Sequence, residues 1–164
     1  MNQNIPNFVR LFNRRPQAFA NIRGSELYPD IEGSVRFYQT MYGVLTVAQI
    51  SGLPSPTGAC MSPIFGFHIH EGESCSGNSE DLFANTKMHF NPRQCRHPYH
   101  AGDMPPLFGA DGYAFSAFLS NRFSVDEIYG RTVVIHSQPD DFITQPSGNS
   151  GIKIACGEIT RVAR

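Results

Sequence analysis

The chain has 164 residues, of which 40% are hydrophobic and 16% are charged, and its formal net charge is −1. This length and apolar content fit one folded domain, and the charge balance excludes a basic surface for nucleic acid or for an anionic membrane. The 15 glycines, 12 prolines and 13 phenylalanines indicate short strands joined by many turns.

Residues 1–16 are polar and end in Arg14-Arg15-Pro16, so we expect an irregular arm ahead of a domain that spans residues 17–164. The arm lacks the apolar run of about 7 to 15 residues that a secretory signal needs, and no stretch reaches the roughly 18 apolar residues of a membrane span. A cytoplasmic location is therefore the expectation for this chain as written. Export by an unrecognised route is the alternative.

Runs rich in β-branched and aromatic residues follow, each bounded by Gly, Pro, Asn or Asp. Residues 35–40 and 44–50 are expected to form a hairpin, with Met41-Tyr42-Gly43 as its turn. Further strands are expected at residues 64–70, 113–119, 132–136 and 152–159. Short strands at this spacing predict an all-β fold, either a sandwich or a barrel.

Two long connections show little sign of regular structure. The segment from His70 to Gly112 contains eight Gly or Pro residues between its ends, and Ser137 to Gly151 is a second such loop. Loops of this length inside a compact domain are usually functional. We therefore expect both loops to contribute to function.

Histidine placement is the most informative feature of the sequence. His68 and His70 alternate in an apolar strand, so both rings are expected on one face, where they could share a metal ion. An isolated His-x-His pair is more often a pair of surface or core histidines. His136 ends the apolar run 132–135, and by itself it would be interpreted as a satisfied histidine at a strand end.

A second histidine cluster lies in the first long loop, with the spacing His-x7-His-x2-His-x2-Asp. Three imidazoles and one carboxylate form a closed tetrahedral set of the kind that zinc occupies in structural sites. A solvated polar loop is the other interpretation. The residues of this cluster are His89, His97, His100 and Asp103.

Taken together, these residues and their neighbours resemble the copper/zinc superoxide dismutases over about residues 18–160. The matching motifs are GFHIHE (66–71), HFNP (89–92), HAGD (100–103), DG (111–112), GRTVVIH (130–136), DD (140–141) and GNSGIKIACG (148–157). They occur in the family's order and spacing, and all six histidines fall on ligand positions. The resemblance implies a Greek-key β-sandwich or flattened barrel with two long functional loops.

The resemblance also implies which residues would hold copper and zinc. The residues that match the copper ligands are His68, His70, His89 and His136. The residues that match the zinc ligands are His89, His97, His100 and Asp103. His89 would therefore bridge both metals. All-imidazole ligation suits Cu(II), which leaves the site with a carboxylate to zinc.

Three further positions take their roles from the resemblance. Asp140 matches the carboxylate that accepts hydrogen bonds from two metal-binding histidines and so fixes their rings. Cys75 and Cys156 match the family's intrasubunit disulfide. Cys60 and Cys95 match no family position, and we expect both to be buried small hydrophobic residues, with a zinc-ligand role for Cys95 as the alternative.

The activity that the resemblance implies is the conversion of superoxide, a small anion, to oxygen and hydrogen peroxide at copper. His89 would release copper on reduction and carry a proton to the developing peroxide. Lys153 occupies the position of a family arginine that attracts superoxide, and it keeps the charge without the rigid fork of a guanidinium. Residues 137–152 contain no Lys or Arg, so weaker long-range attraction of superoxide is expected.

Two other functions stay open at this point. A copper and zinc carrier or storage protein on the same scaffold would show little turnover, although related carriers usually have gaps in the ligand set and none is missing here. A cupin enzyme would explain His68-Ile69-His70, but Ser74 and Cys75 stand where that family needs Glu. Both a monomer and a homodimer are compatible with the sequence.

Overall fold

A computed structural model gives the structure of residues 8–11, 13–55 and 63–163. Its strands are β1 Ala18–Gly24, β2 Glu32–Thr40, β3 Gly43–Ser51, β4 Ile64–Phe65, β5 Phe67–His70, β6 Leu107–Phe108, β7 Ala114–Ser120, β8 Thr132–His136 and β9 Lys153–Arg161. Its helical segments are the 3-10 turns η1 Phe8–Leu11 and η2 Ala84–Thr86 and the short helix α1 Val125–Ile128. The prediction of an all-β fold is confirmed.

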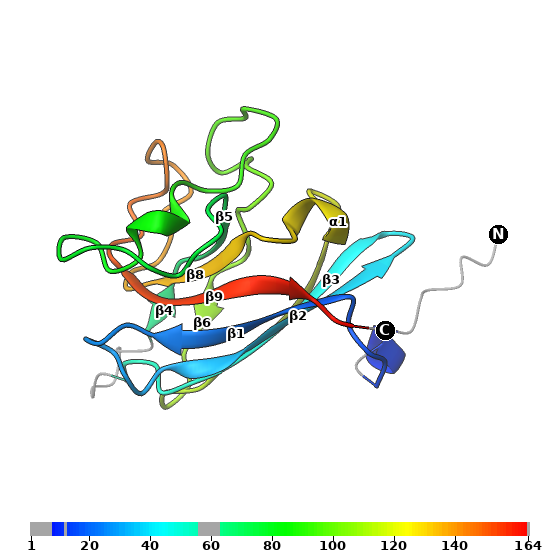
Figure 1. Ribbon diagram of the computed structural model, residues 1–164, viewed down its shortest axis with the longest axis horizontal. Coiled ribbons are helices and arrows are strands. Elements are labelled where there is room, and N and C mark those ends of the chain that lie inside the picture. Colours follow the sequence, from blue (N-terminus) through cyan, green and yellow to red (C-terminus); the bar gives the residue numbers. More distant parts are fainter. Residues whose placement is uncertain (1–7, 12, 56–62, 164) are drawn as a thin grey trace.

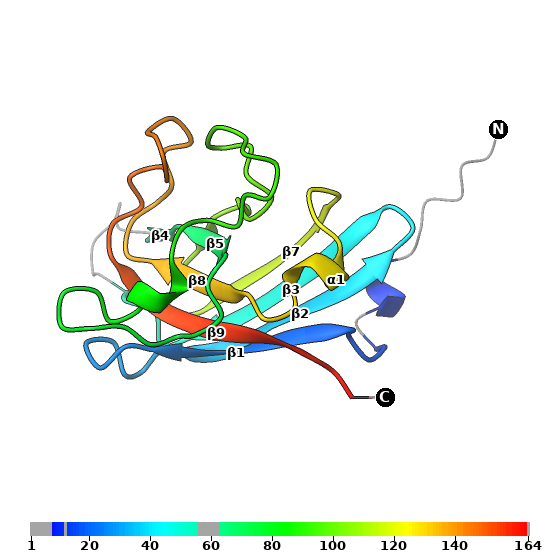
Figure 2. The ribbon, with the colours of Figure 1, turned by 45° about the horizontal axis from the view of Figure 1, so that its top comes forward.

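Seven strands form one antiparallel sheet in the order β5-β8-β9-β1-β2-β3-β7, and β4 pairs with β6 separately. The large sheet curls into a half-barrel (Figure 1). The connections from β3 to β5 and from β7 to β8 each cross from one side of the strand order to the other. Figure 2 shows the second long loop and the later part of the first rising above β5 and β8, so the topology gathers these segments at one end of the molecule.

The core fills the inside of the curl with alternate residues from each strand. Ile22, Phe37, Ile50, Phe67 and Ile135 are all fully buried in one cluster. Burying each such side chain stabilises the fold by roughly 1.5–3 kcal/mol. The packed core therefore gives the end that carries the two long loops a rigid base.

The predicted hairpin is confirmed, because β2 and β3 pair with Thr40 opposite Gly43. Gly43 has φ 128°, a conformation that glycine adopts without strain. The hydroxyl of Thr40 donates a hydrogen bond of 2.8 Å to the carbonyl of Gly43 and closes the turn.

The prediction of one strand over residues 64–70 is wrong, because β4 and β5 belong to different sheets. Gly66 separates them, and its N–H donates to the carbonyl of Gln138 at 2.7 Å. A Cβ at Gly66 would lie 2.8 Å from the Cβ of Ser150, so glycine lets the second loop approach the strand. A close backbone approach is a frequent reason for glycine within a strand pattern.

All three helical segments lie where the sequence patterns indicated none. In the arm, Leu11 at the end of η1 packs against an outward-facing cluster of Tyr38, Leu45 and Val47, so this part is not irregular. The short helix α1 begins with a capping box between Ser124 and Glu127.

Cys60 lies outside the described residues. Within the ranges that the structure describes, no helix is long and apolar enough to cross a membrane.

Candidate metal centre

Strand β5 places two histidines on one face, as its alternation predicted. All four residues of β5 are buried, and Phe67 and Ile69 belong to the hydrophobic core. His68 and His70 therefore point to the opposite face, with ring centroids 6.3 Å apart. The apolar half of the strand anchors the pair in the fold.

The first long loop is bound along the free edge of β5. Ile69 N donates to Gly102 O at 2.9 Å, and Phe90 N donates to Ile69 O at 2.8 Å. The same pairing creates isolated bridges from His68 to Asp103 and from His70 to His89. Backbone hydrogen bonds of the loop, rather than its own secondary structure, thus carry its ligands to the strand.

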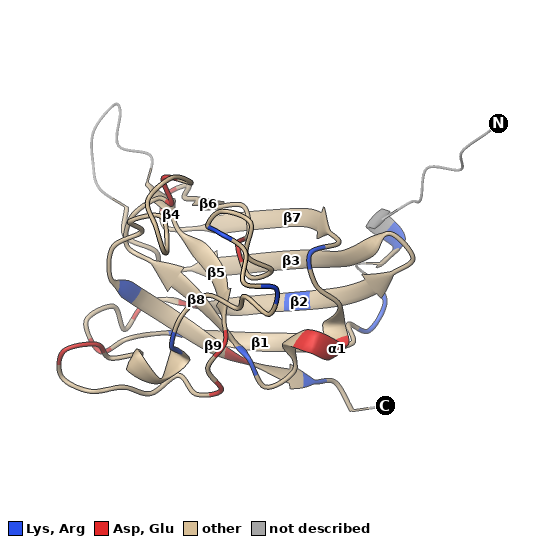
Figure 3. Cartoon of the chain, turned by 90° about the horizontal axis from the view of Figure 1, so that it is seen from above, with Lys and Arg blue, Asp and Glu red and all other residues tan. Residues whose placement is uncertain are grey.

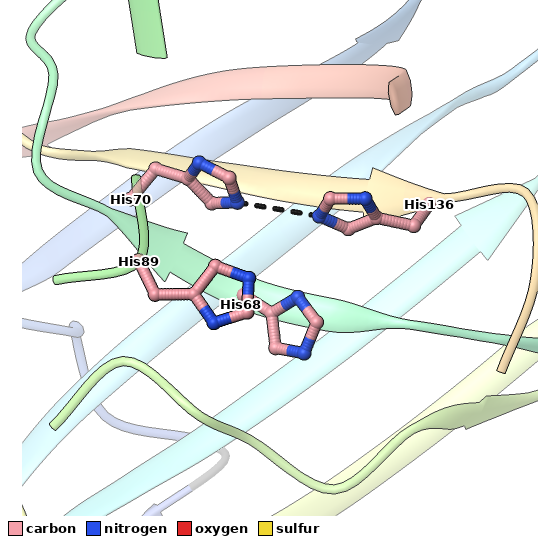
Figure 4. Close-up of side chains that lie close together, drawn as sticks. All are labelled: His68, His70, His89 and His136. Atoms are coloured by element: carbon pink, nitrogen blue, oxygen red, sulfur yellow. Dashed lines mark hydrogen bonds between the residues drawn. The ribbon is translucent and has the colours of Figure 1, made fainter. Parts of the chain in front are cut away.

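Four histidines converge into one buried cluster, which Figure 4 shows. Nε2 of His70 lies 3.2 Å from Nε2 of His136, and the rings of His68 and His89 are 3.9 Å apart between centroids. One potential ligand atom from each residue lies within 4.8 Å of the others. The cluster consists of His68, His70, His89 and His136, the residues expected at copper.

The second buried cluster shares His89 with the first. Nδ1 of His89 lies 2.8 Å from Oδ1 of Asp103, and Nδ1 of His97 lies 3.1 Å from Oδ2 of the same carboxylate. Nδ1 of His100 lies 3.3 Å from Oδ1. The cluster therefore brings together His89, His97, His100 and Asp103, the residues expected at zinc.

A buried carboxylate joins the two clusters. Asp140 accepts from Nε2 of His68 at 2.7 Å and from Nε2 of His97 at 2.9 Å. Gly148, with φ 72°, packs so closely that a Cβ there would collide with Asp140 Oδ1 and lie 2.7 Å from His97 Nε2. The second loop thereby fixes both rings from behind, as partners of metal-binding histidines do.

Ring nitrogens without partners show how a metal would fit. Within the described chain, four buried ring nitrogens have no hydrogen-bond partner, although buried polar atoms are almost always paired. They are Nδ1 of His68, His97 and His100 and Nε2 of His89. His89 directs its two nitrogens to different clusters, because Nδ1 faces Asp103. Two adjacent cations sharing this ring would satisfy these atoms, so the residues fit both metals.

Burial keeps the histidines in the form that binds metals. It lowers the pKa of His68 and of His70 well below the ordinary value and lowers the pKa of His136 to about 4, and neighbouring histidines act in the same direction. The pKa of His100 is lowered as well, chiefly by burial. Burial alone would raise the pKa of Asp103, but the hydrogen bond with His89 and the nearby histidine charges lower it overall. Neutral imidazole and ionised carboxylate are the ligating forms.

An open pocket of about 530 Å³ leads to the first cluster, and His70, His89 and His136 line it. Lys153 lies in this pocket at the start of β9, opposite His136 across a register shift between β8 and β9. Bulges of this kind re-aim side chains. The pocket gives a small molecule access to the ligands expected at copper, and it does not include the ligands found only in the second cluster.

The expected disulfide is present. Cys75 and Cys156 are bonded, with Cα atoms 5.6 Å apart and a sequence separation of 81. A loop of that length is worth about 4.5 kcal/mol in the chain-entropy model. Cys95 is a free thiol and only half-buried, so the prediction of a buried hydrophobic residue is wrong for it, and it belongs to neither histidine cluster.

Sequence patterns missed two residues that support the second cluster. Gln145 accepts from His97 N at 3.1 Å and donates to His97 O at 2.7 Å, so its side-chain amide holds the backbone of His97 through two hydrogen bonds. Arg122 donates to the carbonyl of Pro98 at 2.7 Å. A lone Gln or Arg in a loop carries no pattern that could have revealed these long-range contacts.

A half-barrel of antiparallel strands that, together with its long loops, gathers six histidines and an aspartate around one shared ring defines a candidate binuclear metalloprotein. A sequence model of the copper/zinc superoxide dismutase family matches residues 31–159. The chain belongs to the copper/zinc superoxide dismutase family, a family of oxidoreductases.

Individual relatives agree with this assignment. Superoxide dismutase [Cu-Zn] 2 of Aquifex aeolicus is 32% identical over 163 aligned residues, which cover 90% of this chain and 89% of that protein. The crystal structure of a SOD-like protein from Bacillus subtilis is 28% identical with a TM-score of 0.70, covering 85% of this chain and 96% of that one. Cu/Zn superoxide dismutase from Brucella abortus has a TM-score of 0.72 at 23% identity, covering 86% and 98%, and supports the fold alone.

Proposed function

We propose that this protein is a superoxide dismutase that converts two superoxide anions and two protons to oxygen and hydrogen peroxide. Copper would be held by His68, His70, His89 and His136, and zinc by His89, His97, His100 and Asp103. Bound copper supplies the one-electron chemistry, because it can accept an electron from one superoxide and give it to the next. The observation that carries the proposal is the pair of complete buried ligand sets joined through His89.

The position of the His89 ring supports a role in proton delivery. Its Nε2 lies in the cluster that the pocket reaches, while its Nδ1 contacts Asp103 on the far side. A ring held at Nδ1 can bind a proton at Nε2 without changing its position. It can then donate that proton to a peroxide product in the pocket.

Lys153 supplies a positive charge beside these ligands. Its Nζ donates to Asp81 Oδ2 at 2.7 Å and to Phe83 O at 3.1 Å, and its side chain is 15% exposed. These contacts hold the ammonium group close to the pocket wall, where it would attract and position superoxide over a short range. A lysine held in this way acts as a fixed point charge.

The test is activity after reconstitution with copper and zinc. Competition with cytochrome c for superoxide from xanthine oxidase should show turnover that depends on copper. The control is the protein loaded with zinc alone, because zinc has no redox chemistry. Stable binding of both metals without turnover would contradict the proposal and favour a carrier or storage role.

A further inference from the structure

The two lysines of this chain both line the pocket that leads to the first histidine cluster. Eleven of its thirteen basic residues are arginines, and the two lysines are Lys87 and Lys153. Figure 3 shows Lys and Arg spread over many elements rather than gathered on one face. The ammonium groups of both lysines therefore lie at this pocket.

The two lysines differ in how strongly their contacts restrain them. Lys153 is largely buried and paired with Asp81, so its charge is partly offset by that carboxylate. Lys87 is exposed, and within the described ranges no carboxylate lies within ion-pair distance of its Nζ. Only Lys87 therefore presents a cation that is free to meet an incoming anion.

The backbone at Lys87 has an unusual conformation. Its φ is 61° and its ψ is −142°, a combination that glycine populates readily and side-chain-bearing residues rarely do. Its carbonyl accepts a hydrogen bond of 2.8 Å from Nδ1 of His70, which ties this position to the first cluster. Backbone strain of this kind concentrates at functional sites. A glycine would relieve the strain but would bring no charge to the pocket.

The other charged side chains that line the pocket show why a free cation at Lys87 would matter for anion binding. Apart from the paired Asp81, the carboxylates lining the pocket are Glu26 and Glu80, and both would repel an anion. Among the described lining residues, Lys87 is the cation that can offset them. Removing it would leave an acidic entrance to a site that must admit superoxide.

We propose that Lys87 captures small anions at the pocket entrance and passes them to the ligands expected at copper. This inference rests on the proposed function. Lys153 acts at short range beside the ligands, and Lys87 acts at longer range through its free charge. Salt separates the two roles, because the Debye length falls from about 30 Å at 0.01 M to about 3 Å at 1 M ionic strength.

The first experiment compares variants of the copper- and zinc-loaded protein. Lys87→Gln and Lys87→Gly should each lower kcat/KM for superoxide by about three- to tenfold at low ionic strength and by less than about twofold at high ionic strength. Lys87→Arg should keep the wild-type value. Lys87→Gly removes the backbone strain as well as the charge, so backbone strain at this position cannot explain its defect.

The matched control is Arg161→Gln, which removes one positive charge from the other end of β9. Arg161 contacts Asp126 and Tyr129, and eight residue steps of extended strand, about 26 Å, separate it from Lys153. This variant should retain the wild-type salt dependence. A defect equal to that of Lys87→Gln would show that the effect comes from net charge alone and would overturn the inference.

The second experiment uses azide, a small monoanion, and follows its binding to the Cu(II)-loaded protein through the copper absorption spectrum. Lys87→Gln and Lys87→Gly should raise the dissociation constant of azide by about three- to tenfold at low salt. Acetylation with a lysine reagent should modify Lys87 before the paired Lys153 and reproduce this shift. In Lys87→Arg, the same reagent should leave azide binding unchanged.

The outcomes separate this inference from the proposed function. If the wild type shows no turnover but Lys87→Gln still weakens azide, the proposed function fails and the role of Lys87 in anion capture stands. If the wild type is active and both neutral variants match it in kcat/KM and azide binding, Lys87 has no such role. A protein that binds no copper would overturn both.

Discussion

Asp140→Asn tests whether one carboxylate positions both metal sites. In the native protein, Asp140 accepts from Nε2 of His68 and from Nε2 of His97, and it also accepts from the N–H of Phe142 at 2.7 Å. Because both rings carry their proton on Nε2, both Nδ1 atoms are free to bind a metal. Asparagine keeps the shape but offers one acceptor oxygen and one amino group. One ring must therefore lose its partner.

The size of the effect follows from that lost contact. A hydrogen bond to a charged group is worth about 1.5–3 kcal/mol, so the metal-free variant should lose about that much stability against urea. Loss of such an outer partner lowers metal affinity by about 10- to 100-fold. We expect zinc to weaken by this factor, because His97 belongs only to the second cluster, and copper to weaken through His68.

The assay is competition for zinc against a chromophoric chelator, followed by the same titration with copper. Asp141→Asn is the matched control, since Asp141 is exposed and accepts hydrogen bonds from the N–H groups of Ile143 and Thr144 in its own loop. Both metals should bind this control as they bind the wild type. Unchanged zinc affinity in Asp140→Asn would refute the positioning role.

Three further predictions follow from the same geometry. Asp103→Ala removes the carboxylate of the second cluster and should weaken zinc selectively and slow copper loading through a looser His89; full zinc occupancy by elemental analysis would contradict this. Lys153→Glu should lower superoxide turnover more than about tenfold at low salt with both metals bound, and unchanged rates in pulse radiolysis would remove Lys153 from the mechanism. In the metal-free protein, the pKa of His136 is about 4 when folded and 6.5 when unfolded, so the unfolded state binds protons first as pH falls. The free energy of unfolding should be constant with respect to this group above pH 6.5 and should fall by about 3 kcal/mol by about pH 4, measured by urea denaturation; stability that rises in this window would contradict it.

The sequence by itself determined much of the site, because local patterns have local physical causes. Alternation in β5 assigned His68 and His70 to one face, and the spacing of His89, His97, His100 and Asp103 indicated a ligand set. The class of fold followed in the same way from short strands and frequent turns. These inferences needed only the period of a strand and the chemistry of the side chains.

Tertiary structure decided which ring nitrogen of a histidine is available to bind a metal. Nδ1 of His68 is free because Asp140, 72 positions away, occupies Nε2, and no local pattern encodes that distance. The split of residues 64–70 into two strands depends on the approach of Ser150 to Gly66, and the restraint on Lys153 depends on Asp81. Contacts between distant segments exist only once the chain is folded, so they fix tautomers, paired charges and strand breaks that the order of residues leaves open.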